Sequence, residues 1–243
     1  MEKFIKRISA SAAGIVVFLL AASFYLQLKG FVRDDENFLV LPRAYAEETG
    51  SAQKEIPANF AFPQDHILGN KDAKVSIYEY SSFGCSHCAD MHLEVMPEIV
   101  KKYVNAGLVR IVFVPLPLDK NSMDAALLAE CVAPEKYFNF AEILFKHQRD
   151  WAIAFEPQKV LLQYAKLSGV GDSKAQACLR NDVAAARILG DRKVGLDELG
   201  KQGTPTLIVS SGKGNEMVLG ADFEGLSKIV DAHLAAIYNE NAK

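Results

Sequence analysis

The chain has 243 residues, half of them hydrophobic, and a formal net charge of −3. This length and apolar content suffice for the core of one ordinary globular domain with an insertion. Acidic and basic residues are nearly balanced, and no run of Lys and Arg marks a nucleic-acid surface. We therefore set nucleic acid aside as a partner.

Residues 1–28 are expected to be a signal peptide or a signal anchor. Three basic residues within the first seven positions precede an uncharged apolar stretch from Ile8 to Leu26, which is the layout of a secretory signal. The stretch also approaches the roughly 20 residues that span a bilayer as a helix, and a buried core helix is the alternative. Cleavage after Ala46 fits an A-x-A pattern, but whether the segment is cleaved stays open. Both outcomes export the rest of the chain.

The segment after the signal, residues 29–62, shows no sustained periodicity and is expected to be a linker or tether. The sequence then predicts a buried strand over Val75–Tyr80, a helix over Ala89–Ala106 and a second strand over Leu108–Val114. Strand, helix and strand at these lengths indicate a βαβ unit, in which the two strands are parallel and the crossover is right-handed.

A long helical region follows, over residues 119–199. Apolar residues recur there at three-and-four spacing, and the region is broken at Pro134, Pro157, Gly169 and Gly171. The end of the chain predicts a hairpin, with strands at Leu207–Val209 and Met217–Leu219, and then an amphipathic helix over Phe223–Tyr238.

Cys85-Ser86-His87-Cys88 lies between the first strand and the first helix. At such a junction the unpaired N–H groups of the helix point at the first sulfur and favour the thiolate, which is the reactive species. Cys85 is therefore the predicted nucleophile, and Cys88, one turn into the helix, is predicted to resolve the mixed disulfide. A structural disulfide without turnover is the alternative.

His87 lies between the two cysteines, where its N–H could donate to the Cys85 thiolate and a protonated fraction would add positive charge. The alternative is an exposed histidine that only fills the turn. Export also affects the other two cysteines, because disulfides persist outside the cytoplasm. We expect a structural Cys131–Cys178 bridge, with two free, buried cysteines as the alternative.

These motifs resemble a known family when they are taken together. Phe83-Gly84-Cys85-Ser86-His87-Cys88, the helical insertion, Gly203-Thr204-Pro205-Thr206 and the closing hairpin and helix are similar to the thioredoxin fold and, within it, to the DsbA-like thiol-disulfide oxidoreductases. The resemblance covers about residues 65–240. It implies an α/β fold with a central mixed sheet flanked by helices, in which residues 63–118 and 200–243 form the thioredoxin domain and 119–199 an inserted helical subdomain.

The resemblance also implies roles for residues around the dithiol. Pro205 would be cis and lie beside the sulfurs, blocking metal-like approach, and the Thr204 backbone would face an extended substrate strand. Phe83 is expected to give an apolar docking surface for unfolded chains, with an ordinary core phenylalanine as the alternative. His92, one turn beyond Cys88, is expected to have a surface or packing role.

Glu79 interrupts an otherwise apolar strand six residues before Cys85. A buried carboxylate is costly unless it shifts its pKa or finds a partner. The resemblance implies that an acidic residue here lies beneath the dithiol, which makes Glu79 a candidate proton relay for Cys88. An exposed glutamate paired with Lys74 is the open alternative.

The function that the resemblance implies is an exported thiol oxidase of the bacterial periplasm or cell envelope. It would donate its disulfide to reduced, unfolded exported proteins and be reoxidised by a quinone-linked, DsbB-like membrane protein. We expect a monomer without organic cofactor or metal, in contact with the membrane only through an uncleaved N-terminal anchor.

Two other functions stay open. Ser86 replaces the proline of the best-studied oxidants of the family, and Thr204 also occurs in isomerases, so a disulfide reductase or isomerase is the first alternative. A copper or zinc metallochaperone that binds through Cys85, His87 and Cys88 is the second. No fourth ligand is evident for it, and Pro205 would crowd the metal.

Overall fold

The structure is a computed structural model, and the chain divides into two compact units, Met1–Gln53 and Lys54–Lys243. In the first unit it describes only two short antiparallel strands, β1 (Val32–Arg33) and β2 (Leu39–Val40). In the second it describes Ile56 and residues 60–198, 203–219 and 222–240. The expected signal or anchor over residues 1–28 and its cleavage site lie outside the described residues. No helix among the described residues is long and apolar enough to cross a membrane.

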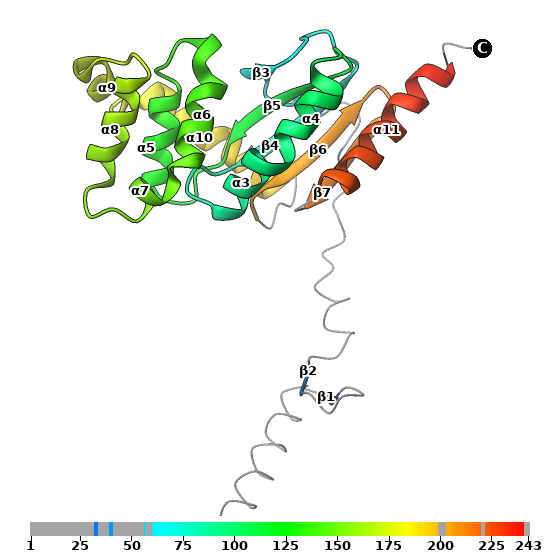
Figure 1. The fold of residues 1–243 in the computed structure, drawn as a ribbon, viewed down its shortest axis with the longest axis horizontal. Coiled ribbons are helices and arrows are strands. Elements are labelled where there is room, and N and C mark those ends of the chain that lie inside the picture. The colour runs from blue at the N-terminus through cyan, green and yellow to red at the C-terminus, as the bar shows by residue number, and fades with distance from the viewer. Residues whose placement is uncertain are drawn as a thin grey trace, which may run out of the picture. The chain divides into compact units, whose positions relative to one another are not determined.

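The second unit is built on a mixed five-stranded sheet with the order β3-β5-β4-β6-β7 (Figure 1). The central pair, β4 and β5, is parallel, and every other pair is antiparallel. The strands are β3 (His66–Leu68), β4 (Val75–Ser81), β5 (Val109–Pro115), β6 (Thr206–Ser211) and β7 (Gly214–Leu219). This confirms the predicted α/β fold with a mixed sheet and the parallel pairing of the first two predicted strands.

Strand β3 was not predicted. Its three residues are only partly buried, and they pair antiparallel with the middle of β5, His66 opposite Phe113 and Leu68 opposite Ile111. A segment this short carries no measurable periodicity, so nothing in its own sequence distinguishes it from a loop.

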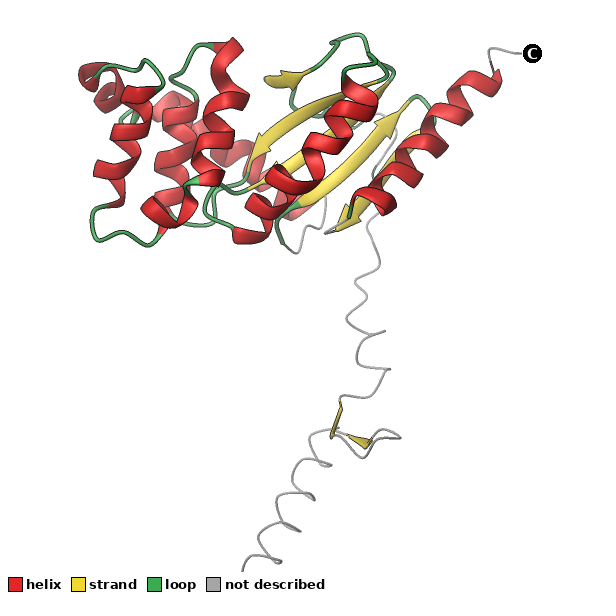
Figure 2. Cartoon of the chain, viewed as in Figure 1, coloured by secondary structure: helices red, strands yellow, loops and turns green. Residues whose placement is uncertain are grey.

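One face of the sheet is covered by a helical run that continues from the dithiol, and by the last helix (Figure 2). Pro97 has no N–H with which to continue the α-helical pattern, and π-helical turns lie on both sides of it. Gly107, with φ of 71°, allows the chain to turn after the run ends. The elements are α3 (Ser86–Asp90), η1 (Met91–Val95), α4 (Met96–Ile99), η2 (Val100–Val104) and α11 (Phe223–Glu240).

The opposite face of the sheet packs against the segment that leads into the domain. Tyr78 and Tyr80 of β4 lie in a buried cluster with β5 and β6 side chains, and Phe62 stacks on Tyr78 with ring centroids 4.1 Å apart. Side chains alternate along a strand, so Tyr78 and Tyr80 face this side while Ile77, Glu79 and Ser81 face the helical run from α3 to η2.

The helical insertion joins β5 to β6 and lies at one end of the sheet (Figure 1). Pro134 begins η3, Pro157 begins α8 and Gly171 precedes α9, so these breaks fall where the sequence predicts them. The elements are α5 (Lys120–Ala129), η3 (Pro134–Lys136), α6 (Tyr137–Lys146), α7 (Gln148–Ala152), α8 (Pro157–Leu167), α9 (Asp172–Cys178), α10 (Asp182–Lys193) and η4 (Val194–Glu198).

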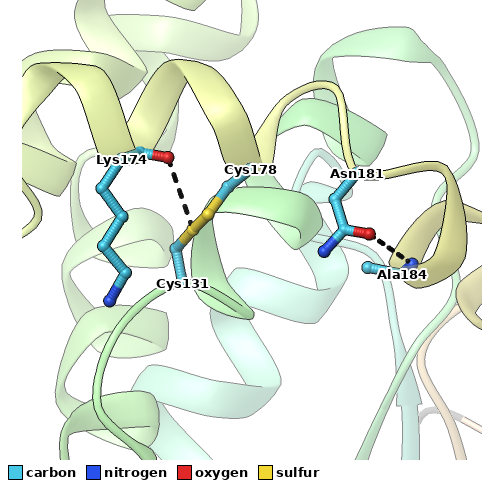
Figure 3. Close-up of a disulfide and its surroundings, with 5 residues drawn as sticks. All are labelled: Cys131, Lys174, Cys178, Asn181 and Ala184. Carbon is cyan, nitrogen blue, oxygen red and sulfur yellow. Dashed lines mark hydrogen bonds between the residues drawn. A yellow bond between two sulfur atoms is a disulfide. The ribbon is translucent and has the colours of Figure 1, made fainter.

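A disulfide ties two parts of the insertion together. Cys131, just after α5, is bonded to Cys178 at the end of α9, with their Cα atoms 6.2 Å apart (Figure 3). The next helix, α10, begins with a side-chain cap, because the Asn181 oxygen accepts a 3.1 Å hydrogen bond from the Ala184 N–H. The bridge and the cap fix the short connections between helices of this layer.

Candidate active site

Cys85 is the N-cap residue of α3, in extended backbone conformation, and its side chain is half-buried. Its Sγ lies 3.4 Å from the Thr204 carbonyl oxygen, to which the thiol donates. The backbone N–H groups of His87 and Cys88 also interact with this sulfur. The Cys85 sulfur thus accepts hydrogen bonds from unpaired N–H groups at the helix N-terminus, as the sequence predicts.

Cys88 lies one turn into α3 and is 0% exposed. Its Sγ accepts a 3.4 Å hydrogen bond from the Ser82 N–H, at the point where the chain leaves β4. Both cysteines are free thiols, so the structure represents the reduced dithiol. Cys85 is the accessible member of the pair and Cys88 the enclosed one.

The two sulfurs divide their charge unequally. The hydrogen bond from the Cys88 thiol lowers the pKa of Cys85 most. Burial opposes it, and the Thr204 side chain and the backbone N–H groups of Cys88 and His87 lower it further, so that this pKa is about 5. The same hydrogen bond and burial raise the pKa of Cys88 far above its usual range. At neutral pH the dithiol therefore carries one negative charge, on the Cys85 sulfur.

The loop before β6 brings Thr204 and Pro205 to the dithiol from 119 residues along the chain. The Thr204–Pro205 peptide bond is cis, and Pro205 is buried. The Thr206 hydroxyl donates a 2.8 Å hydrogen bond to the Gly203 carbonyl and fixes the turn from inside. The Thr204 carbonyl consequently faces Cys85.

His87 is exposed, and its backbone N–H lowers the pKa of Cys85. The sequence predicts a hydrogen bond from the His87 imidazole to the Cys85 thiolate. The structure instead supports a contribution from the backbone N–H of position 87. Any residue except proline supplies that N–H.

Phe83 does not form the expected docking surface, and that expectation is wrong. Its side chain is 1% exposed and packs against Phe113 and Phe145, with ring centroids 5.2 and 5.1 Å away. Burial of the ring between a sheet strand and helix α6 makes it a core residue that supports the turn before Cys85.

Glu79 lies in the middle of β4 and is 0% exposed, which rules out the exposed pairing with Lys74. It projects from the same sheet face as Ser81, whose side chain lies near enough to lower the pKa of Cys88. The His92 imidazole lies beside it, with Glu79 Oε2 3.7 Å from His92 Nδ1. Neither carboxylate oxygen has a hydrogen-bond partner among the described residues.

Of two further residues at the site, His92 was expected to have a surface or packing role and Gln148 was not predicted. His92 lies four residues after Cys88 on the same side of the helical run and packs on Phe145, with ring centroids 4.7 Å apart. Gln148, at the start of α7, donates from Nε2 to the carbonyls of Phe83 and Cys85 at 2.7 and 2.9 Å. The packing on Phe145 agrees with the packing role expected for His92, but its spacing from Cys88 did not predict its place beside Glu79, and no local pattern singles out Gln148.

Within the part of the chain that the structure describes, no three His, Cys, Asp or Glu side chains are grouped so that they could hold a metal ion. The site is therefore described by its thiols, its backbone donors and one buried carboxylate. An arrangement of this kind can exchange disulfides through a mixed-disulfide intermediate.

Comparison with known families adds to this geometry. Residues 61–232 match the family model described as Thioredoxin. This chain belongs to the thioredoxin family. Its sequence relatives are named as protein-disulfide oxidoreductases or disulfide bond formation proteins, and structures named DsbA share its fold.

Two sequence relatives illustrate this. A Rickettsia conorii protein, named provisionally as a protein-disulfide oxidoreductase, is 30% identical over 69% of this chain and 61% of its own length. Disulfide bond formation protein D of Bacillus subtilis is 26% identical over 69% of this chain and 76% of its own length. The chain spans between 53% and 61% of the rickettsial relatives that it matches.

A solved structure shares the fold. Alpha-DsbA1 of Wolbachia pipientis superimposes with a TM-score of 0.68 at 24% identity, covering 75% of this chain and 96% of that protein. This likeness and the family match confirm the DsbA-like fold expected from the sequence.

Proposed function

We propose that this protein is a thiol:disulfide oxidoreductase that works as an oxidase and gives its Cys85–Cys88 disulfide to pairs of cysteines in other proteins. The observation that carries the proposal is the division of charge between the two sulfurs, with the pKa of Cys85 at about 5 and that of Cys88 raised. A stabilised thiolate favours the reduced form, and the disulfide is correspondingly a better oxidant.

The reaction balances as follows. A client thiolate attacks Cys85 Sγ, the bond to Cys88 breaks, and Cys88 leaves as a thiolate that takes up a proton. A second client thiolate then attacks the client sulfur of the mixed disulfide, and Cys85 leaves as the stabilised thiolate. Two client thiols are oxidised to a disulfide, the protein disulfide is reduced to a Cys85 thiolate and a Cys88 thiol, and one proton is released.

Glu79 is the proposed proton donor and acceptor for Cys88. It is fully buried, and it shares a sheet face with Ser81, whose side chain interacts with the Cys88 sulfur. Burial penalises the charge of the Cys88 thiolate. Without a nearby proton donor Cys88 would therefore be a poor leaving group when the disulfide opens, and without a nearby proton acceptor it would be slow to lose its proton when the disulfide forms again.

The client surface is proposed to combine main chain and exposed apolar side chains. The Thr204 carbonyl beside Cys85 could pair with an extended client segment. Ile153 and Phe155 are exposed in the loop that directly follows α7, and α7 carries the Gln148 contact to Cys85. Leu118 is exposed just before the N-cap of α5. These three side chains take the role that the sequence argument gave to Phe83.

Export to a bacterial periplasm or cell envelope is part of the proposal. The basic and then apolar N-terminus supports it, and so does the Cys131–Cys178 disulfide, since disulfides persist outside the cytoplasm. Reduced exported proteins would be the clients. A quinone-linked, DsbB-like membrane protein would restore the disulfide.

Mixing the oxidised protein with a reduced, unfolded two-cysteine protein tests this function. We expect one client disulfide for each protein molecule and no transfer by the Cys85→Ser variant. If the reduced protein instead opens client disulfides while the oxidised form transfers none, it is a reductase. Rearrangement of scrambled disulfides as the dominant activity would make it an isomerase.

A further inference from the structure

A pocket of about 380 Å³ lies between the helical run that begins at the dithiol, the β3–β5 side of the sheet and helix α6. Most of its lining is apolar and includes Leu68, Leu93 and Ile111. Four polar side chains also line it: the buried Glu79, the partly buried His92, and the exposed Asn139 and Glu142 of α6. The pocket therefore extends from a buried carboxylate to the protein surface.

The polar end of this pocket is incompletely bonded within the protein. The two carboxylate oxygens of Glu79 and the Nδ1 atom of His92 have no hydrogen-bond partner among the described residues. Such groups are costly to bury unless water or another partner reaches them, and a pocket this large and polar at one end can hold water. His92 is the more accessible of the two, with a side chain 10% exposed against 1% for Glu79.

His92 and Glu79 thus lie side by side at the pocket, with His92 the more accessible of the two. Its Nδ1 is 3.7 Å from Glu79 Oε2, which is ion-pair range but longer than a hydrogen bond. Its ring is held between Phe113 and Phe145, at centroid distances of 6.1 and 4.7 Å. This packing fixes the imidazole in one place beside the carboxylate.

The pocket and the client side of the dithiol are lined by different residues. None of residues 83–88 or 203–205 lines the pocket. A client that contacts only Cys85 and the Thr204 carbonyl would therefore not contact the lining of the pocket. This matters because Cys88 must gain a proton while the client is bound.

We propose that His92 is a positioning residue for Glu79 and that it carries protons between this carboxyl group and water in the pocket. When Cys88 leaves as a thiolate, Glu79 gives it a proton; a proton from the pocket water then returns to Glu79 through the imidazole. During reoxidation the same proton moves in the opposite direction. The inference rests on the proposed thiol–disulfide exchange at Cys85–Cys88.

Few other titratable groups face this route. The catalytic helix contributes Cys88 and His92, β4 contributes Glu79, and α6 contributes Glu142 and Tyr137. Burial, and then the charge of Glu130, raises the pKa of the Tyr137 hydroxyl, which stays protonated through the neutral range. The β5 and β6 residues opposite Glu79 are Phe113 and Leu207, which do not titrate.

The test is the rate at which the oxidised protein accepts electrons from a reduced two-cysteine peptide, followed from pH 5 to pH 8. The fluorescence of Trp151 reports it, since this is the only tryptophan and it packs in the same core cluster as Cys88. The variants are His92→Ala, Glu79→Gln and the control His147→Gln, which changes a histidine outside the pocket. The ratio of variant to wild-type rate at each pH removes the ionisation of the peptide thiols.

We expect His92→Ala to slow the reaction about tenfold, less than the hundredfold typical of losing a direct acid–base group, and to change the pH profile. Added imidazole should restore the rate of His92→Ala, because the pocket admits it, but not that of Glu79→Gln. The control should match the wild type. If His92→Ala proves unstable, His92→Gln fills the same space but cannot take up a proton, and it should be equally slow.

An unchanged rate and pH profile in both His92 variants, while Glu79→Gln is slow, would overturn the role of His92 and leave the proposed function intact. A slow His92→Ala that imidazole fails to restore would reduce His92 to a packing residue. Failure of the wild-type protein to oxidise the peptide would overturn the proposed function itself.

Discussion

The side-chain amide of Gln148 donates a 2.9 Å hydrogen bond to the backbone carbonyl of Cys85. The same nitrogen donates to the Phe83 carbonyl at 2.7 Å, and the side chain is buried. One residue of the helical insertion thereby holds both ends of the turn that presents the nucleophile. The insertion is part of the active-site support, although it carries neither cysteine of the dithiol.

Replacing Gln148 with Ala should destabilise the reduced protein by about 1–3 kcal/mol, because two buried carbonyls lose a donor. The free energy of unfolding in urea measures this. Gln163→Ala is the matched control, since Gln163 is exposed on α8 and should change stability little. Equal stability of the two variants would mean that the Gln148 bonds contribute nothing.

The ionisation of Cys85 should make the reduced protein sensitive to acid. Its pKa is about 5 in the folded protein, and an unfolded cysteine titrates near about 8.5. A depressed pKa stabilises the folded state above the unfolded value, and this contribution falls as pH drops from about 8.5 through 5. Urea midpoints should therefore decline over this window for the reduced wild type but not for Cys85→Ser. Alkylation rates should give the same apparent pKa, and parallel midpoints for both proteins would contradict the charge division.

Gly84 allows a close approach between the active-site turn and α5. A Cβ at this position would overlap the Ser122 hydroxyl, which is itself buried. Gly84→Ala should cost about 1–3 kcal/mol of stability, as overpacking usually does. The Gly84→Ala/Ser122→Ala double variant should recover most of the loss in the same denaturation measurement. If removing the hydroxyl recovers nothing, the contact with Ser122 is not what requires glycine.

The Cys131–Cys178 disulfide should affect stability much more than chemistry. The two cysteines are 47 residues apart, and a loop of this length corresponds to about 4 kcal/mol in the chain-entropy model. The Cys131→Ala/Cys178→Ala variant should lose at most this much free energy of unfolding, measured in urea, and should still oxidise the client. Loss of client oxidation in a variant that still folds would show that the bridge acts on the dithiol.

Much of the fold and the core of the site could be predicted from local sequence. Val75–Tyr80 and Leu108–Val114 are long, apolar and bounded by turn residues, and both became paired strands. The dithiol and the segment at Thr204 carry recognisable motifs, and the structure brings them together. Glu79 could be singled out because a charge interrupts an apolar strand.

What could not be predicted depends on packing between distant segments. Phe83 lies next to the dithiol in sequence, but Phe113 and Phe145 decide that its ring is buried. His92 has the right spacing from Cys88, yet only the fold places it beside Glu79. Gln148 reaches Cys85 from 63 residues away, so its own neighbourhood gives no signal.

The equilibrium reduction potential of the Cys85–Cys88 couple against glutathione, with Cys131 and Cys178 intact, tests the proposed oxidase most directly. The stabilised Cys85 thiolate predicts an oxidising couple, near the value of about −120 mV of the strong oxidant DsbA. A value near thioredoxin's, about −270 mV, would contradict the account and make this protein a reductant.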